Sequence, residues 1–199
     1  MDTRDLVTLD PEGSPWEQVF TVAPLVLVGS LEPTGALDLA PKHLAMPLGW
    51  GRHFGFVCRE EHSTYRNIRE RREFSVTYPL ADEVLLASLA ASPREPDDTK
   101  PALRALPTLA PTVIETPLFA GGYLFLECRL DRFVDGFGPH SLITGEIVAA
   151  RAARQARRLH ELDEAAVIER TKLLAFLSPS RFAAIDESWS FPFPAGFHR

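Results

Sequence analysis

The sequence predicts a mainly β, antiparallel barrel with a few helices around it. Six or seven apolar, β-like runs are separated by turn signals, a pattern typical of strands that reverse direction. Strands and helices do not alternate regularly, so a doubly wound parallel sheet fits poorly. No repeat and no shift in composition divides the chain, so we expect a single domain over residues 1–199.

Composition and charge place the chain among globular proteins and exclude some partners. Hydrophobic residues make up 45% and charged residues 24%, as in ordinary folded domains. The net charge of −6 argues against a nucleic-acid partner, because phosphate neutralisation needs a basic surface. The longest apolar run, near Leu25–Val28, is too short to span a membrane, and the polar N-terminus is unlike a signal peptide. We therefore expect a cytoplasmic protein without a membrane partner.

The N-terminal elements are predicted by capping and turn residues. A capping-box pattern at Ser14 predicts a short helix to about Phe20. Leu25–Val28 and Leu37–Ala40 are apolar runs around a turn that contains proline and glycine. These two runs predict a hairpin of two strands.

A second group of strands and helices follows a glycine-rich stretch. Phe54–Arg59 is an apolar run that predicts a strand, and Ser63 is placed to cap a helix over Thr64–Arg71. Phe74–Tyr78 alternates with polar residues and predicts the next strand. Asp82 is expected to cap another helix, because leucines follow it at helical spacing.

The second half predicts a long loop and then a long hairpin. Ser92–Pro111 is rich in proline and charge, which indicates a loop with one helical turn near Ala102–Leu106. Val113–Ile114 predicts a short strand. Tyr123–Phe133 alternates apolar and charged residues, and Ser141–Ala150 returns after a glycine-containing turn, so the two predict an antiparallel hairpin.

The C-terminal part is predicted to be an extension of a core that covers residues 20–150. Arg151–Phe176 has a helical composition, with Asp163 as a possible cap, and Trp189–Phe197 places aromatic residues between prolines. Cys58 and Cys128 lie in apolar runs and are expected to be small buried hydrophobic residues. The scattered histidines have no metal-ligand spacing, so we expect no bound metal.

One segment has the features of an anion site. Arg59–Asn67 runs from a predicted strand end into a predicted helix start. A helix N-terminus offers free N–H groups and a partial positive charge, which together hold an anion. Ser63 and Thr64 add hydroxyl donors, and Arg59 and His62 can add charge. This pattern predicts a phosphate cradle; the alternative is a capped surface helix with solvated basic residues.

Two other segments end or begin strands at bends. Asp38–His43 is a strand that ends in a proline bend, where backbone groups are free to bind the polar edge of a ring. His140 is the first residue of a predicted strand, where a histidine near neutrality can meet a ligand at a barrel mouth. The alternatives are an ordinary strand exit and an exposed turn histidine.

Taken in order, these segments resemble the flavin reductase-like family, whose fold is the FMN-binding split β-barrel, antiparallel and Greek-key-like. The likeness runs from about Phe20 to Ala150, roughly two thirds of the chain. The matching stretches are Asp38-Leu39-Ala40-Pro41, Ser63-Thr64-Tyr65-Arg66-Asn67-Ile68, Glu73-Phe74-Ser75-Val76, Leu126-Glu127-Cys128, and His140 with Gly145-Glu146-Ile147.

The resemblance implies a homodimer that binds FMN, with FAD as the alternative, and uses NADH or NADPH as co-substrate. The residues that it places along the isoalloxazine ring, largely through backbone groups, are Asp38, Leu39, Ala40, Pro41, Lys42 and His43. Those that it places around the phosphate are Arg59, His62, Ser63 and Thr64. His140 would stand near the nicotinamide as the catalytic residue.

The implied activity is that of an NAD(P)H-dependent flavin reductase, in which hydride passes from nicotinamide C4 to flavin N5 and then to an unknown electron acceptor. The alternatives are a non-enzymatic, flavoredoxin-like FMN electron-transfer protein, a related split-barrel oxidase, and a binding module without flavin. The chain departs from the family at Asp38, where the family has asparagine. Lys42 either offsets that charge or favours an electron-rich reduced flavin.

Overall fold

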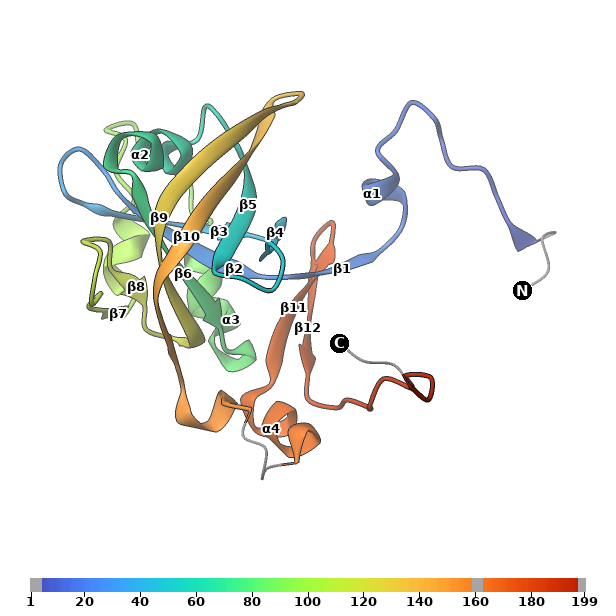
Figure 1. Cartoon of the computed structure of the whole chain (residues 1–199). Coiled ribbons are helices and arrows are strands. Elements are labelled where there is room, and N and C mark those ends of the chain that lie inside the picture. The colour runs from blue at the N-terminus through green and yellow to red at the C-terminus, as the bar shows by residue number, and fades with distance from the viewer. Residues whose placement is uncertain (1–4, 159–162, 197–199) are drawn as a thin grey trace.

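The computed structural model describes residues 5–158 and 163–196, and its main element is a curled, antiparallel seven-stranded sheet (Figure 1). The strand order is β3-β2-β6-β9-β10-β5-β4. The strands are β2 (Val26–Leu31), β3 (Leu37–Lys42), β4 (Ala45–Pro47), β5 (His53–Arg59), β6 (Glu73–Pro79), β9 (Gly122–Phe137) and β10 (His140–Ala152). The mainly β, antiparallel half-barrel confirms the predicted fold class.

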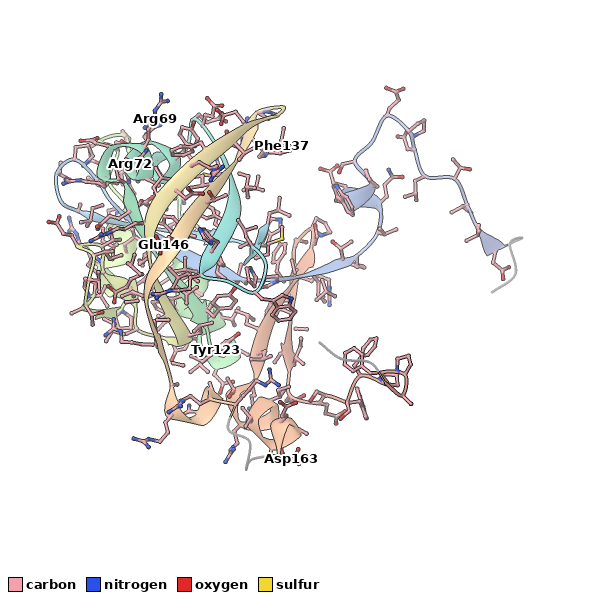
Figure 2. All side chains as sticks on the ribbon, in the orientation of Figure 1. Arg69, Arg72, Tyr123, Phe137, Glu146 and Asp163 are labelled. Carbon is pink, nitrogen blue, oxygen red and sulfur yellow. The ribbon has the colours of Figure 1, made fainter. Side chains whose placement is uncertain are left out.

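The predicted hairpins are both present. β2 pairs with β3, and β9 pairs with β10 to form the longest hairpin of the fold. Figure 2 shows Tyr123 near the start of β9 and Phe137 at its far end. A break in the register between Thr144 and Gly145 bends this hairpin around the core. A Cβ atom on Gly145 would lie 2.6 Å from the ring of Phe74, so the close packing here requires glycine.

The helices are short, and most of the predicted side-chain caps are absent. The helices are α1 (Pro15–Gln18), α2 (Ser63–Arg71), α3 (Val84–Leu89) and α4 (Glu164–Thr171), with 3₁₀ turns at Ala81–Glu83, Pro101–Ala105 and Arg154–Ala156. Asp163 accepts a hydrogen bond from the Ala165 N–H, as expected of a cap. Ser14 makes no such bond, Ser63 is already the first residue of α2, and Asp82 lies within a 3₁₀ turn.

The C-terminal segment is not the long helix predicted over Arg151–Phe176. Arg151 still belongs to β10, and only α4 is helical beyond the turn at Arg154–Ala156; residues 159–162 of the predicted helix lie outside the described residues. β11 (Leu173–Ser178) pairs with β1 (Thr21–Pro24) and β12 (Arg181–Ile185) in a separate three-stranded sheet. Pairing with β1, far away in the sequence, overrides the local helical composition. Of the predicted aromatic tail Trp189–Phe197, residue 197 is also outside the described residues.

Two core clusters lie on opposite sides of the curled sheet. On β2, Val26 and Val28 join Phe54, Phe56 and Phe74 in the larger cluster inside the curl. Leu27, which lies between these two valines on β2, packs with Leu39 of β3 in the second cluster, together with α3 and the loop that follows it. This alternation is what a strand covered on both faces requires. Both cysteines, Cys58 and Cys128, are buried and free, as predicted.

Val113–Ile114, predicted as a strand, is part of a loop that wraps around a buried carboxylate. Glu127 of β9 is 1% exposed and accepts hydrogen bonds from the backbone N–H groups of Thr112, Val113 and Ile114. Glu73 of β6 binds the N–H groups of the next two residues in the same way. These N–H groups therefore meet side chains instead of a neighbouring strand.

Candidate functional site

The N-terminus of α2 is held against β3 and β2 by buried contacts. Tyr65 and Ile68 on one face of α2 belong to the larger core cluster. On an adjacent face, Asn67 Nδ2 donates to Ser30 Oγ of β2 at 3.1 Å, and both residues are buried. Thr64 Oγ1 donates to Asp38 Oδ2 of β3 at 3.3 Å. The helix start and the beginning of β3, joined by two side chains that are 26 positions apart in the sequence, therefore form one wall.

A first hollow, with a volume of about 490 Å³, opens between this wall and the segment 90–100. A volume of this size lies within the range of small-molecule sites. Seven of the predicted site residues line the first hollow: Asp38, Ala40, Pro41, Lys42, His62, Ser63 and Thr64. Arg66, Arg94 and Lys100 line it as well, together with Glu61 and Asp98.

A second hollow, of about 210 Å³, adjoins the first and contains three of the four other predicted residues, His43, Arg59 and His140. It is lined by Pro41, Lys42, His43, Leu44, Val57, Cys58, Arg59, His62 and His140. Pro41, Lys42 and His62 line both hollows. His140 reaches this place because the register of β10 on β5 sets it opposite Arg59. Leu39 lines neither hollow, since its side chain is 1% exposed in the outer core cluster.

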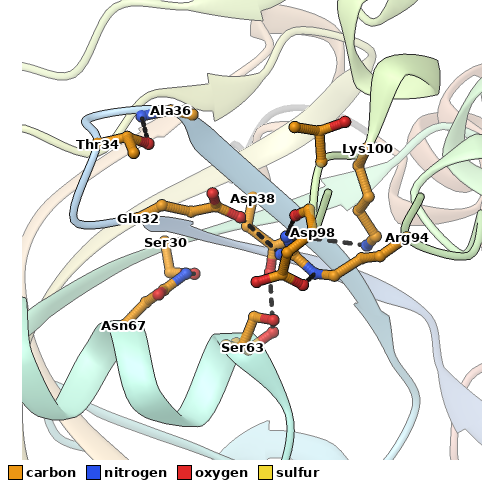
Figure 3. A network of polar contacts seen from close by, with 12 residues as sticks. Ser30, Glu32, Thr34, Ala36, Asp38, Ser63, Asn67, Arg94, Asp98 and Lys100 are labelled. Atoms are coloured by element: carbon orange, nitrogen blue, oxygen red, sulfur yellow. Dashed lines mark hydrogen bonds and ion pairs between the residues drawn. The ribbon is translucent and has the colours of Figure 1, made fainter. Parts of the chain in front are cut away.

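Asp38 is 2% exposed and is surrounded by cations from the segment 92–100 (Figure 3). Its Oδ1 lies 3.1 Å from Arg94 Nη2 and 3.3 Å from Lys100 Nζ. Arg94 Nη2 also lies 2.6 Å from Glu32 Oε1, and Lys100 Nζ donates to the backbone carbonyls of Leu39 and Ala90. The charge of Asp38 is thus offset by Arg94 and Lys100, and not by Lys42 as the sequence allowed.

Lys42 faces the second hollow and the histidines around it. Its Nζ donates to Cys58 Sγ at 3.4 Å. Burial and then the charge of Lys42 lower the pKa of His43, whose ring also stacks on Phe176 with centroids 4.5 Å apart. The same two causes, in the same order, lower the pKa of His62. Burial raises the pKa of the Cys58 thiol although Lys42 opposes the change, so this thiol stays protonated.

The start of α2 has the donors that an anion needs. The N–H groups of Tyr65 and Arg66 donate to the His62 carbonyl. The N–H groups of Ser63 and Thr64, at the first positions of the helix, are the ones that can donate to a ligand. The Ser63 hydroxyl accepts a bond from Arg66 Nη2 at 3.3 Å and keeps its own proton for donation. The hydroxyl proton of Thr64 is already donated to Asp38.

These donors fit a phosphate-bearing ligand with a flat, partly apolar body. A helix N-terminus, a hydroxyl and nearby cations suit the phosphate. Two buried atoms in the first hollow, Asp38 Oδ1 and Arg94 Nη2, are at ion-pair distance but have no aligned hydrogen bond within the described residues. The proline bend at Pro41 and the adjoining second hollow extend the cavity away from the helix start.

Arg94 and Lys100 were missed in the sequence because they lie in a segment whose composition predicts only a loop. Their shared partner, Asp38, is far away in the sequence. The bond from Lys100 to the Leu39 carbonyl, for example, joins residues that are 61 positions apart. A buried acidic residue at the end of an apolar strand was the only available signal, since such a charge needs a partner. Within residues 5–158 and 163–196, no three histidine, cysteine or acidic side chains are placed to bind a metal ion. No described helix is both long and apolar enough to cross a membrane.

Comparison with known proteins adds a family and a fold. Residues 20–165 match the family model described as "Flavin reductase like domain". No curated protein sequence is significantly similar to the chain.

Solved structures with similar folds include the following three. Nitrilotriacetate monooxygenase component B from Bacillus cereus is 19% identical, with a TM-score of 0.79 over 94% of this chain and 98% of that one. Flavoredoxin from Methanosarcina acetivorans is 17% identical, with a TM-score of 0.76 over 96% and 97% of the two chains. An NADH:FAD oxidoreductase from Streptomyces globisporus is 15% identical, with a TM-score of 0.65 over 82% and 86%. At these identities the likeness shows the fold alone.

Proposed function

The chain belongs to the flavin reductase-like domain family, and on this premise we propose that it is an FMN-binding, NAD(P)H-dependent flavin reductase. The observation that supports the proposal best is the meeting of β3 and α2 at one hollow with phosphate-type donors, which continues into a second hollow beside His140. A flavin mononucleotide has the matching shape, a ring with a polar edge and a single terminal phosphate. FMN suits the cradle better than FAD, because one helix start provides donors for one terminal phosphate.

The phosphate is assigned to the start of α2. Ser63 donates its hydroxyl and its N–H group, and Thr64 donates its N–H group while its side chain holds Asp38 in place. Arg59 stands next to this group and contributes positive charge, although it also pairs with Glu61 at 2.7 Å. His62 stands there as well, and its lowered pKa makes it a neutral imidazole that can offer one ring N–H. The ring is assigned to the backbone of residues 38–43, because β3 is an edge strand of the seven-stranded sheet and its side away from β2 has no partner strand in that sheet.

The second hollow is assigned to the nicotinamide of NADH or NADPH. When bound, the flavin supplies an acceptor at N5 for the hydride that leaves nicotinamide C4, so the nicotinamide is oxidised as the flavin is reduced. His140 and His43 line this hollow and would shield the two rings from water when both are bound. His140 is half-buried and orients the nicotinamide for transfer, which is a matter of position and not of acid strength.

The likeness to a flavoredoxin favours a second candidate, an FMN electron carrier that receives electrons from a protein. The two candidates differ in their response to nicotinamide nucleotides. The protein loaded with FMN is mixed with NADH or with NADPH without air, and the visible flavin band is followed. Bleaching within seconds supports the reductase, and indifference to both nucleotides supports the carrier.

Two variants test the residue assignments. Ser63→Ala is expected to weaken FMN binding by about 1–3 kcal/mol, the value of a hydrogen bond to a charged group. An unchanged dissociation constant would refute the cradle. His140→Ala is expected to slow the bleaching of the flavin by NADH or NADPH more than it weakens FMN binding. An unchanged bleaching rate would show that His140 has no role in hydride transfer. Protein that takes up no FMN would contradict both flavin functions.

We also propose a homodimer that acts in the cytoplasm, where nicotinamide reductants are supplied. The sheet β1-β11-β12 and the neighbouring β4 expose large apolar side chains, among them Val22 at 70%, Met46 at 52% and Phe182 at 55%. Trp189 and Phe191 of the C-terminal segment are also exposed, at 84% and 71%. Exposed apolar area of this kind marks protein interfaces. Sedimentation equilibrium at the mass of one chain would contradict the dimer.

A further inference from the structure

Lys42 lies at the junction of the two hollows and has no acidic partner in the described part of the chain. It is the last residue of β3 and one of three residues that line both hollows. Its Nζ contacts Cys58 Sγ at 3.4 Å, and a thiol is a weak hydrogen-bond acceptor. Among the residues that the structure describes, no carboxylate oxygen is recorded within ion-pair distance of this ammonium group.

The other cations around the hollows are already engaged. Arg94 and Lys100 pair with Asp38, and Arg59 pairs with Glu61. Arg66 bonds to Ser63 and to the Glu61 carbonyl. Both bonds of Arg66 go to neutral groups, so Lys42 and Arg66 are the cations of this group without a recorded acidic partner among the described residues. Of these two, Lys42 alone lines both hollows, and its charge is left for a ligand at their junction.

The neighbouring histidines do not replace the charge of Lys42. Both His43 and His62 line the second hollow, and their pKa values are lowered by burial and by Lys42 itself. The imidazoles are therefore neutral at neutral pH, and Lys42 supplies the positive charge at this junction.

We propose that Lys42 contacts the flavin ring and favours its reduced form, so that it raises the reduction potential of the bound flavin. This inference rests on the proposed FMN site. Two-electron reduction places more negative charge on the pyrimidine edge of the ring, and a fixed ammonium group binds that charge more strongly than the oxidised ring. A ligand with its phosphate at α2 and its ring beside the bend at Pro41 would have Lys42 within reach of its ring, because Lys42 lines both hollows.

The alternative contact is with the phosphate, and it has a different thermodynamic signature. The phosphate has the same charge in both redox states, so losing a contact to it weakens the binding of oxidised and reduced FMN equally. Losing a contact to the ring weakens the binding of reduced FMN more. The ratio of the two dissociation constants therefore tells the contacts apart, because a ligand shifts an equilibrium only by its differential affinity.

The experiment measures that ratio and the reduction potential in four variants without using turnover. Lys42→Met removes the charge, and Lys42→Arg keeps it. Ser63→Ala removes a phosphate contact, and Arg69→Met removes an exposed cation of α2 that lines neither hollow (Figure 2). FMN affinity is titrated for the oxidised and the chemically reduced cofactor, and the potential is measured against a reference dye.

Lys42→Met is expected to weaken the binding of reduced FMN by a factor at least five times larger than the factor for oxidised FMN. A tenfold differential would correspond to a fall of about 30 mV for this two-electron couple. Lys42→Arg is expected to keep the reduction potential of the bound flavin close to that of the unaltered protein. Ser63→Ala is expected to weaken the binding of oxidised and reduced FMN by the same factor. Arg69→Met is expected to change neither affinity.

Equal weakening of both redox forms by Lys42→Met, or no weakening, overturns the inference while FMN binding by the unaltered protein still supports the proposed function. Failure of the unaltered protein to bind FMN overturns the proposed function first. If Lys42→Met does not fold, Lys42→Gln provides the same comparison with a polar side chain.

Discussion

Replacement of Asp38 by asparagine is expected to destabilise the folded protein by about 3 kcal/mol. Asparagine has the same shape and can still accept the bond from Thr64, so the change removes the charge and little else. The charge faces Arg94 Nη2 at 3.1 Å and Lys100 Nζ at 3.3 Å, and the three side chains are 3%, 18% and 13% exposed. Removing one member of a pair buried this well costs about 3–5 kcal/mol.

The lower end of that range applies because both cations retain other acceptors. Arg94 keeps the carboxylate of Glu32 at 2.6 Å, and Lys100 keeps the carbonyls of Leu39 and Ala90. Neither charge is therefore left without a partner. The remaining loss is the attraction between groups that water screens poorly.

The assay is urea unfolding near neutral pH, followed by circular dichroism. Tryptophan fluorescence is a poor probe here, because Trp16, Trp50 and Trp189 are at least 64% exposed in the folded state. Asp98→Asn is the matched control, since that carboxylate also pairs with Arg94 but its side chain is 71% exposed. The control is expected to cost less than about 1 kcal/mol. Equal losses for the two variants, or no loss for Asp38→Asn, would refute the reasoning.

Three more predictions concern the sheet and its buried groups. Glu127→Gln is expected to cost about 2–3 kcal/mol near neutral pH. Burial raises the pKa of Glu127, but bonds from Val113, Thr112 and Ile114 outweigh it and lower the pKa, so the stabilisation is present above the unfolded-state pKa of about 4.3. The difference in the free energy of unfolding between Glu127→Gln and the unaltered protein should then shrink as the pH falls through the lowered pKa of Glu127. A difference that is constant with pH would contradict this. Gly145→Ala is expected to lose about 1–3 kcal/mol in calorimetry, because its Cβ would meet Phe74 at 2.6 Å, and an unchanged melting temperature would argue against that packing. Burial raises the pKa of Cys58 and Cys128, so neither thiol should be alkylated by iodoacetamide in the folded protein; mass spectrometry showing a modified Cys128 before unfolding would be inconsistent with the burial.

The strands of the curled sheet and the start of α2 were predictable because their signals are local. Alternation along Tyr123–Phe133 placed Leu126 and Cys128 on the inner face, where both belong to the larger core cluster. The strand over Leu37–Ala40 and the helix over Thr64–Arg71 were also recognised from neighbouring residues; the structure extends the strand to Lys42 and starts the helix one residue earlier, at Ser63. A period of two and a helix-start pattern are properties of a few adjacent residues, so they can be recognised without the rest of the chain.

The errors arose where distant residues decide the conformation. Leu173–Ser178 pairs with β1, and Val113–Ile114 binds the carboxylate of Glu127, so neither segment follows its own composition. Arg94 and Lys100 acquire their place at the candidate site only because folding brings their loop over Asp38. By itself the sequence determined which strands and which helix start surround the hollows. The tertiary structure alone decided which charges meet there, because an ion pair depends on distance in space and leaves no pattern between residues far apart in the chain.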